Sequence, residues 1–370
     1  MGDIDMHAIA SQVIWLAFVL GALFGAVAQH THFCTMGSVG DIVNIGSWER
    51  MRQWLLAIAV AIIGTNLLAY FGVIDLSKSI YTNPKLIWLS HLVGGALFGF
   101  GMVLASGCGS KTLIRIGSGN LKSLVVFLVL GLSAFMTLKG LLAVPRANLL
   151  DPVAVTFATT QDVPSLLGGL FGHPPLLSLL SAGVIGALLL LFVLASRSFR
   201  TWENILAGVL IGAIIVAAWY VSGKLGYVAE DPNTLQETFV ATNSGKMESF
   251  SFVAPYAYTL DLLMMWTDTS KAVSFGIAAA LGVVTGSFVY AIVTGTFRWE
   301  GFGGIEDTAN HLTGAVLMGF GGVTALGCTV GQGLSGLSTL SLGSFLSFAA
   351  IIAGAVAALK YQGWRMERSL

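Results

Sequence analysis

Two stretches of the chain, HLVGGALFGFGMVLASGC at residues 91–108 and HLTGAVLMGFGGVTALGC at residues 311–328, are copies of one pattern. They share the opening His-Leu, a central Gly-Phe-Gly and the terminal Gly-Cys at a constant offset of 220 residues. Each copy is an apolar, glycine-rich segment that stops at a cysteine, Cys108 or Cys328. The pattern therefore indicates a duplicated, helical fold with one cysteine at the same place in each copy.

Cys34, the third and last cysteine of the chain, joins the pattern through a closer echo. GALFG occurs at 21–25 and again at 95–99, and this offset of 74 residues places Cys34 at the position of Cys108. A weaker echo, GVLIGAIIVAAWYV at 208–221, ends without a thiol. The segment pattern therefore occurs four times, and three of the four copies end in a cysteine. This predicts a functional site built from cysteines.

The composition indicates an integral membrane protein. The 370 residues are 55% hydrophobic and 10% charged, whereas a soluble domain carries about 25% charged residues. The formal net charge is zero, and because no basic patch occurs, we expect no nucleic-acid partner. Three cysteines cannot all pair, so free thiols are expected.

A helix that crosses a bilayer needs about 20 mainly apolar residues. Nine segments satisfy this requirement and predict an all-α, polytopic single domain over residues 1–370: 8–29, 53–73, 88–107, 121–142, 176–196, 202–221, 271–294, 308–327 and 341–361. The first segment lacks the basic flank of a cleaved signal peptide, so we expect a retained span. The apolar segment 253–266 is short and holds Asp261, which favours an interfacial or packed helix.

Lys and Arg in short loops favour an outer N-terminus and an inner C-terminus. Five spans precede the second half, so the two repeat halves, 8–197 and 202–361, are expected to have opposite orientations. Inverted repeats of this kind are typical of transporters, whose substrate path lies between the halves. A polar insert at about 224–250 is expected on the outer side.

Each cysteine is followed by a short polar, glycine-rich segment: CTMGSVGDIVNIG at 34–46, CGSKTLIRIGSG at 108–119 and CTVGQGLSGLSTL at 328–340. We expect a helix break and then a short helix or re-entrant turn, which is tolerated at membrane depth only where protein or a wet cavity satisfies the backbone. The N-terminus of such a helix attracts anions.

The candidate substrate-binding residues are the three cysteines and their neighbours. Adjacent glycines leave the sulfur atoms unshielded, and nearby hydroxyl and amide groups add neutral donors. The predicted set is Cys34, Cys108, Cys328, Gly107, Gly109, Gly327, Ser110, Thr329 and Gln332. Lys111 and Arg115, four residues apart on one helix face, either attract the anion towards the inner exit or reflect the positive charge of inner loops.

Other motifs are weaker. His30 and His32 beside Cys34 in HTHFC suggest zinc or copper ligands, but the other cysteine segments lack histidine at these spacings, so we expect no metal and no cofactor. SGCGSKT fails the phosphate-loop pattern. Two further features are read as structural. His91 and His311 are expected to cap their spans at the membrane interface, and the pairs Gly21/Gly25 and Gly95/Gly99 to mark close helix packing.

The duplicated G-x-x-x-G-F-G…G-C units, SGCGSKTLIRIGSGNLKSL and GCTVGQGLSG resemble the YeeE/YedE family of bacterial sulfur-transport membrane proteins over nearly the whole chain, apart from the insert. The resemblance implies an inner-membrane importer of thiosulfate, with relatives linked to selenium or other sulfur compounds. It implies an hourglass-like inverted repeat whose cysteine-bearing loops meet at a constriction, where transport depends on Cys328, Cys108 and Cys34. It also implies a cytosolic TusA-like sulfur-carrier protein as a partner.

A thiol relay is physically reasonable for such a substrate. Thiosulfate is a dianion, which is costly to place in a bilayer. Neutral thiols provide several shallow sites that bind and also release, and we expect the order Cys328, Cys108, Cys34. The alternative, a membrane enzyme acting on sulfur or selenium, requires a thiolate in an electropositive setting, for which only Cys108 beside Lys111 qualifies. We expect a transporter and not an enzyme.

Overall fold

The computed structural model describes residues 6–171, 174–231 and 235–369. In chain order the helices are α1 (Met6–His30), α2 (Thr35–Ile45), α3 (Glu49–Tyr70), α4 (Trp88–Leu104), α5 (Gly109–Gly117), α6 (Leu121–Lys139), α7 (Ala143–Pro145), α8 (Val163–Phe171), α9 (Pro174–Leu194), α10 (Trp202–Tyr220), α11 (Ala254–Met264), α12 (Phe275–Val293), α13 (Ile305–Thr324) and α14 (Leu342–Ser369). One 3-10 turn, three π-helical turns and four two-residue strands complete the fold: η1 (Leu76–Lys78), η2 (Arg146–Leu150), η3 (Val221–Leu225), η4 (Gly331–Gly336), β1 (Lys85–Leu86), β2 (Val155–Thr156), β3 (Tyr227–Val228) and β4 (Thr238–Phe239).

The fold is that of an all-α, multi-pass membrane protein. Among the described residues, eight helical segments are long and apolar enough to cross a membrane, and they coincide with eight of the nine predicted spans. The remaining predicted span, 308–327, is helix α13, which has 20 residues but carries Glu306 and Asp307 in its first turn. Helix α11 has only 11 residues, in agreement with the expectation that 253–266 is a short helix.

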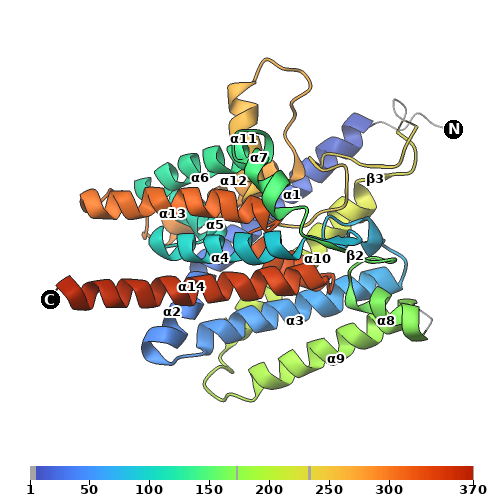
Figure 1. The fold of residues 1–370 in the computed structure, drawn as a ribbon, viewed down its shortest axis with the longest axis horizontal. Helices are drawn as coiled ribbons and strands as arrows, with labels where there is room; N and C mark the ends of the chain where they lie inside the picture. Colours follow the sequence, from blue (N-terminus) through green and yellow to red (C-terminus); the bar gives the residue numbers. More distant parts are fainter. Residues whose placement is uncertain (1–5, 172–173, 232–234, 370) are drawn as a thin grey trace.

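The long helices run along the long axis of the molecule, and their connections gather at two ends (Figure 1). The insert end holds the loops 71–87 and 140–162 and the segments 221–231 and 235–253, where β1 pairs with β2 and Ser79 bridges to Met247. The other end, here called the basic end, holds the loops 46–48, 195–201 and 294–304 and the end of α14.

Glycines allow the central helices to touch backbone to backbone. A Cβ atom at Gly21 or Gly25 of α1 would overlap the carbonyl oxygens of Ala279 or Val283 in α12. Gly95 and Gly99 of α4 lie in the same way against α14, where their Cβ atoms would meet the carbonyl oxygens of Ser347 and Ile351. The prediction that these glycine pairs mark close helix packing is therefore confirmed.

The end of the polar insert lies in the protein core. Phe250 and Phe252 are 1% and 0% exposed, and each packs within 5.9 Å, centroid to centroid, of Phe24 in α1. Phe250 also contacts Phe275 at the start of α12. The strands β3 and β4 and the exposed loop near Gly245 form the polar part of the insert, whereas residues 247–253 help to build the centre of the molecule.

Candidate sulfur site between the short helices

A residue in the left-handed backbone conformation ends the helix before each cysteine. His32, Ser106 and Leu326 have φ angles of 52°, 56° and 58°, and each lies two residues before a cysteine. Residues other than glycine rarely adopt this backbone conformation. The turn after each long helix is closed by backbone hydrogen bonds, such as Gly107 N–H to the Met102 carbonyl at 2.8 Å. The predicted helix breaks are thus present, with the same backbone geometry in all three copies.

Each cysteine begins the short segment that follows it, and backbone N–H groups point at two of the sulfur atoms. The N–H of Gly37 donates to Cys34 Sγ at 3.5 Å. Cys328 Sγ accepts from the N–H groups of Gly331 and Phe252, both at 3.4 Å. Because the first N–H groups of a helix have no intrahelical partner, these short helices surround the thiols with positively polarised groups.

Cys108 has a different neighbourhood. Its sulfur lies 3.3 Å from the hydroxyl of Ser110, and the backbone N–H of Lys111 occupies the place that Gly37 and Gly331 take in the other copies. The hydroxyl of Thr329, which follows Cys328, also faces this sulfur. The hydroxyl of Thr329 in the second half of the chain therefore lies near the cysteine of the first half, without a hydrogen bond of normal geometry.

The three cysteines gather in one region although the sequence separates them widely. The thiols of Cys34 and Cys108 face each other, and Cys328 is near enough to Cys108 to interact with it electrostatically. All three are free and buried: Cys34 is 6% exposed, and Cys108 and Cys328 are 0% exposed. The three thiols thus lie together in the interior of the protein, where the surrounding residues shield them from solvent.

The other predicted site residues are also buried around these thiols, and two of them carry unpaired polar atoms. Thr329 Oγ1 and Gln332 Oε1 make no hydrogen bond of normal geometry, although both side chains are 0% exposed. Buried polar groups nearly always find a partner. Gln332 Nε2 is held by the Ala325 carbonyl at 2.5 Å, and its side-chain oxygen has no hydrogen-bond partner.

Tyr256 and Phe252 belong to the site, and sequence reasoning missed both. Tyr256 Oη donates to the carbonyl of Gly109 at 2.5 Å, and it is fully buried. Phe252 supplies an N–H to Cys328. Both residues come from the insert and the short helix α11, which carry no copy of the cysteine motif, so no local signal could have indicated them.

Positive side chains lie on the basic side of Cys34 and Cys108. Lys111 is partly buried and is close enough to both thiols to interact with them electrostatically. Arg115 Nη1 donates instead to the Ser106 carbonyl at 2.7 Å, where it supports the left-handed turn before Cys108. The two cations share one helix as predicted, and of the two it is Lys111 that lies close enough to the thiols to interact with them electrostatically.

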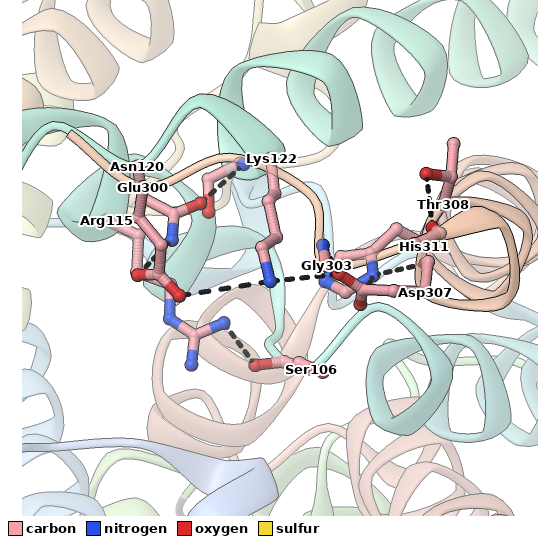
Figure 2. A network of polar contacts seen from close by, with 11 residues as sticks. Ser106, Arg115, Asn120, Lys122, Glu300, Gly303, Asp307, Thr308 and His311 are labelled. Carbon is pink, nitrogen blue, oxygen red and sulfur yellow. Dashed lines mark hydrogen bonds and ion pairs between the residues drawn. The ribbon is translucent and has the colours of Figure 1, made fainter.

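A second polar network connects chain segments at the basic end (Figure 2). Lys122 at the start of α6 lies 2.9 Å from Asp307 Oδ2 and 3.8 Å from Glu300 Oε1. Asn120 Nδ2 donates to Glu300 Oε2 at 2.8 Å, and His311 Nδ1 lies 3.0 Å from Asp307 Oδ1. These contacts join the loop 294–304 to the α5–α6 connection without touching the cysteines.

The matched histidines His91 and His311 are buried between helices, and their expected interfacial role stays a prediction. His91 and His311 are 2% and 5% exposed, although Trp88 and Ile305 at the starts of α4 and α13 are 36% and 91% exposed. His91 Nδ1 lies 2.6 Å from Ser347 Oγ in α14. Beside Cys34, His30 Nδ1 lies 2.8 Å from Tyr290 Oη. Within the described residues, no group of three or more His, Cys, Asp or Glu side chains has an arrangement that could hold a metal ion.

A multi-pass helical membrane protein with helix breaks and unpaired polar groups buried at its centre has the architecture of a transporter. The family model for sulphur transport matches residues 30–357 of this chain. The chain belongs to this sulphur-transport family, and it is a transporter rather than an enzyme.

Two curated relatives match almost the whole chain. It is 26% identical to the thiosulfate transporter TsuA of Escherichia coli strain K12, with 87% of each protein covered. It is 25% identical to the thiosulfate transporter TsuA of Spirochaeta thermophila, with 92% of this chain and 97% of the relative covered. A probable transporter, YedE of Escherichia coli, is 29% identical over 28% of this chain and 24% of its own length.

Proposed function

We propose that this protein imports thiosulfate across the bacterial inner membrane and that Cys328, Cys108 and Cys34 bind the anion in that order. The observation that carries the proposal is the gathering of three buried free thiols at equivalent helix breaks. The similarity to two thiosulfate transporters over most of the chain supports the choice of substrate.

The chemistry of the site suits a divalent anion that must also leave. A thiosulfate ion away from water needs donors, and thiols, hydroxyls and helix N-termini supply them without a fixed full charge at each step. The N–H groups directed at Cys34 and Cys328 and the Ser110 hydroxyl beside Cys108 are such donors. In this mechanism the thiols act in their neutral form, because a thiolate would repel the anion.

The packing of the helices supports an inverted repeat. Helix α1 packs on α12 and α3 packs on α10, while α4 packs on α14 and α6 packs on α13. These contacts are preserved when α1 is exchanged with α10, α3 with α12, α4 with α13 and α6 with α14. In this scheme α11 is the fourth short helix, and Val253 at its N-terminus takes the place of a cysteine.

The distribution of charge supports an inner position for the basic end. Arg50, Arg52 and Arg298 lie in or beside its short connections, as expected for cytoplasmic loops. In this orientation Cys328 faces the outside and Cys34 the cytoplasm, with the N-terminus outside and the C-terminus inside. A cytosolic TusA-like sulfur carrier would then receive the anion at the basic end.

Purified protein in liposomes tests the proposal. Labelled thiosulfate supplied outside should accumulate inside in unchanged form, and a variant with all three cysteines replaced by alanine should transport nothing above empty liposomes. Sulfite, sulfate and selenosulfate as competitors determine the substrate. Preferential inhibition by selenosulfate would assign the protein to selenium compounds, whereas wild-type uptake no higher than that of the triple variant would refute the proposal.

A further inference from the structure

A cavity of about 200 Å³ lies on the insert side of the cysteine cluster. Its walls come from the end of α6, from η2, from the insert, from the start of α11 and from the end of α13. Gly327, the residue before Cys328, forms part of its wall. The cavity, here called the outer cavity, therefore lies next to the cysteine that the proposed path reaches first.

The lining of the outer cavity suits an oxoanion. It contains one cation, Arg146, together with the polar side chains of Asn243, Ser249, Ser251 and Tyr258. Arg146 is only loosely engaged: its Nε atom lies 3.7 Å from Asp151 Oδ2 and makes no hydrogen bond. A guanidinium group with unused donors is suited to bind a sulfur oxoanion.

Glu248 is the one feature of this lining that opposes an anion. Its side chain is partly buried in the cavity wall, and its carboxyl group accepts hydrogen bonds from the Ser244 hydroxyl and the Asn243 backbone N–H. No salt bridge joins it to a cation among the described residues, in contrast to Glu237 of the same insert, which pairs with Lys78 at 2.5 Å.

Among the described residues, no cation is ion-paired with Glu248, although charged and phenolic groups lie around it. Tyr258 of α11 and Tyr81, which lies between η1 and β1, are the phenols near enough to interact with it electrostatically. Arg146 of η2, the one cation of the cavity lining, has its Nε atom 3.7 Å from Asp151 Oδ2 and is not paired with Glu248. Lys246 on the insert is exposed. Lys139 at the end of α6 lies in the adjoining cavity, where Lys271 is bound to Asp261 at 2.6 Å.

We propose that the outer cavity is a loading site, where Arg146 and the neighbouring hydroxyls hold a sulfur oxoanion before it reaches Cys328, and that it accepts the anion only when Glu248 is protonated. This inference rests on the proposed function of the chain as a thiosulfate importer. With Glu248 neutral the lining has a net positive charge from Arg146, whereas with Glu248 ionised the carboxylate cancels that charge and repels a dianion.

Burial raises the pKa of the Glu248 carboxyl group to about 7, and the hydrogen bonds from Ser244 and Asn243 lower it only in part. The group is therefore mainly protonated at a mildly acidic pH and mainly ionised at a mildly alkaline pH. Uptake is expected to be high below the pKa and to fall as the pH rises through it. Between pH 6 and pH 8, about one unit on each side of the pKa, the protonated fraction falls about tenfold.

The test is the dependence of thiosulfate uptake into liposomes on the outer pH, with the membrane potential clamped by potassium and valinomycin. Thiosulfate remains a dianion over this range, so its own charge does not change. For the wild type we expect about a tenfold fall in initial rate between pH 6 and pH 8. Glu248→Gln, which is permanently neutral, should keep the high rate at both values. Glu237→Gln, the matched control on the same insert, should retain the wild-type profile.

A wild-type slope in the Glu248→Gln variant, or a flat profile in the wild type, would overturn the inference while leaving the transport function intact. Absence of wild-type uptake at every pH would instead count against the proposed function. If Glu248→Gln does not fold, equilibrium binding of labelled thiosulfate to the wild-type protein in detergent replaces it. Its affinity should fall about tenfold over the same range, and a constant affinity would refute the loading site.

Discussion

The two sides of the cysteine cluster differ in the charge of the groups that lie near the thiols. On the insert side, Cys328 is contacted by the uncharged backbone N–H groups of Gly331 and Phe252. On the basic side, the thiols of Cys34 and Cys108 have the ammonium group of Lys111 nearby. The copies of the motif are alike in backbone, but the third residue after the cysteine is glycine in two copies and lysine in the third.

In the proposed path, this difference gives the repeated fold a direction. Identical helix breaks provide similar neutral sites, and a single side chain biases one end of the row with positive charge. In the proposed path, an anion that enters by the neutral side would be attracted onward by the cation without being bound to it from the start. Substitutions at the centre of the cysteine cluster, on its insert side and on its basic side test this difference.

The largest effect is expected at the centre. Cys108→Ala removes the thiol that faces Cys34 and lies near Cys328. Loss of a hydrogen bond to a charged ligand costs about 1.5–3 kcal/mol, which corresponds to a fall in uptake of about 10- to 150-fold. Cys34→Ala and Cys328→Ala should each lower uptake by less. Liposome uptake measures this, with gel filtration to verify folding, and full uptake by Cys108→Ala would rule out the relay.

An intermediate effect is expected on the insert side. A Cβ atom at Gly331 would lie 2.5 Å from Ser251 Oγ and 3.3 Å from Tyr81 Oη. Gly331→Ala should displace the segment that donates to Cys328, at a cost of about 1–3 kcal/mol in stability, and lower the melting temperature together with uptake. Gly40→Ala in α2 is the control, because nothing lies within 4 Å of its Cβ position. It should stabilise the protein by about 0.5–1 kcal/mol, and equal melting temperatures for both variants would contradict this account of the site.

The smallest effect is expected on the basic side. Lys111→Gln removes a partly buried charge near two thiols, and a charge interaction of about 0.5–1 kcal/mol predicts a two- to fivefold loss of uptake. Lys122→Gln is the matched control: it removes a lysine whose partners are Asp307 and Glu300 and not a thiol, so uptake per folded molecule should be unchanged. If both substitutions reduce this rate equally, the asymmetry between the two sides has another origin.

Much of the local structure could be predicted from composition and repetition. The apolar runs located the long helices to within a few residues, because a span must be apolar over a fixed length. The repeated Gly-Cys endings located the helix breaks before Cys108 and Cys328, and the glycine pairs in α1 and α4 correctly indicated close packing. The burial of His91 and His311 could not be predicted in this way, because it depends on neighbouring helices that are distant in the sequence.

The sequence alone determined that this is a helical membrane protein with three equivalent cysteines at three helix ends. Only the tertiary structure decided that the thiols meet, that Phe252 and Tyr256 complete their surroundings, and that Arg146 and Glu248 line one cavity beside them. The physical reason is range: helix formation and helix ending depend on neighbours within a few turns, whereas a site depends on side chains that long-range packing brings together. Phe252 and Cys328 are 76 residues apart in the chain, yet they share a hydrogen bond.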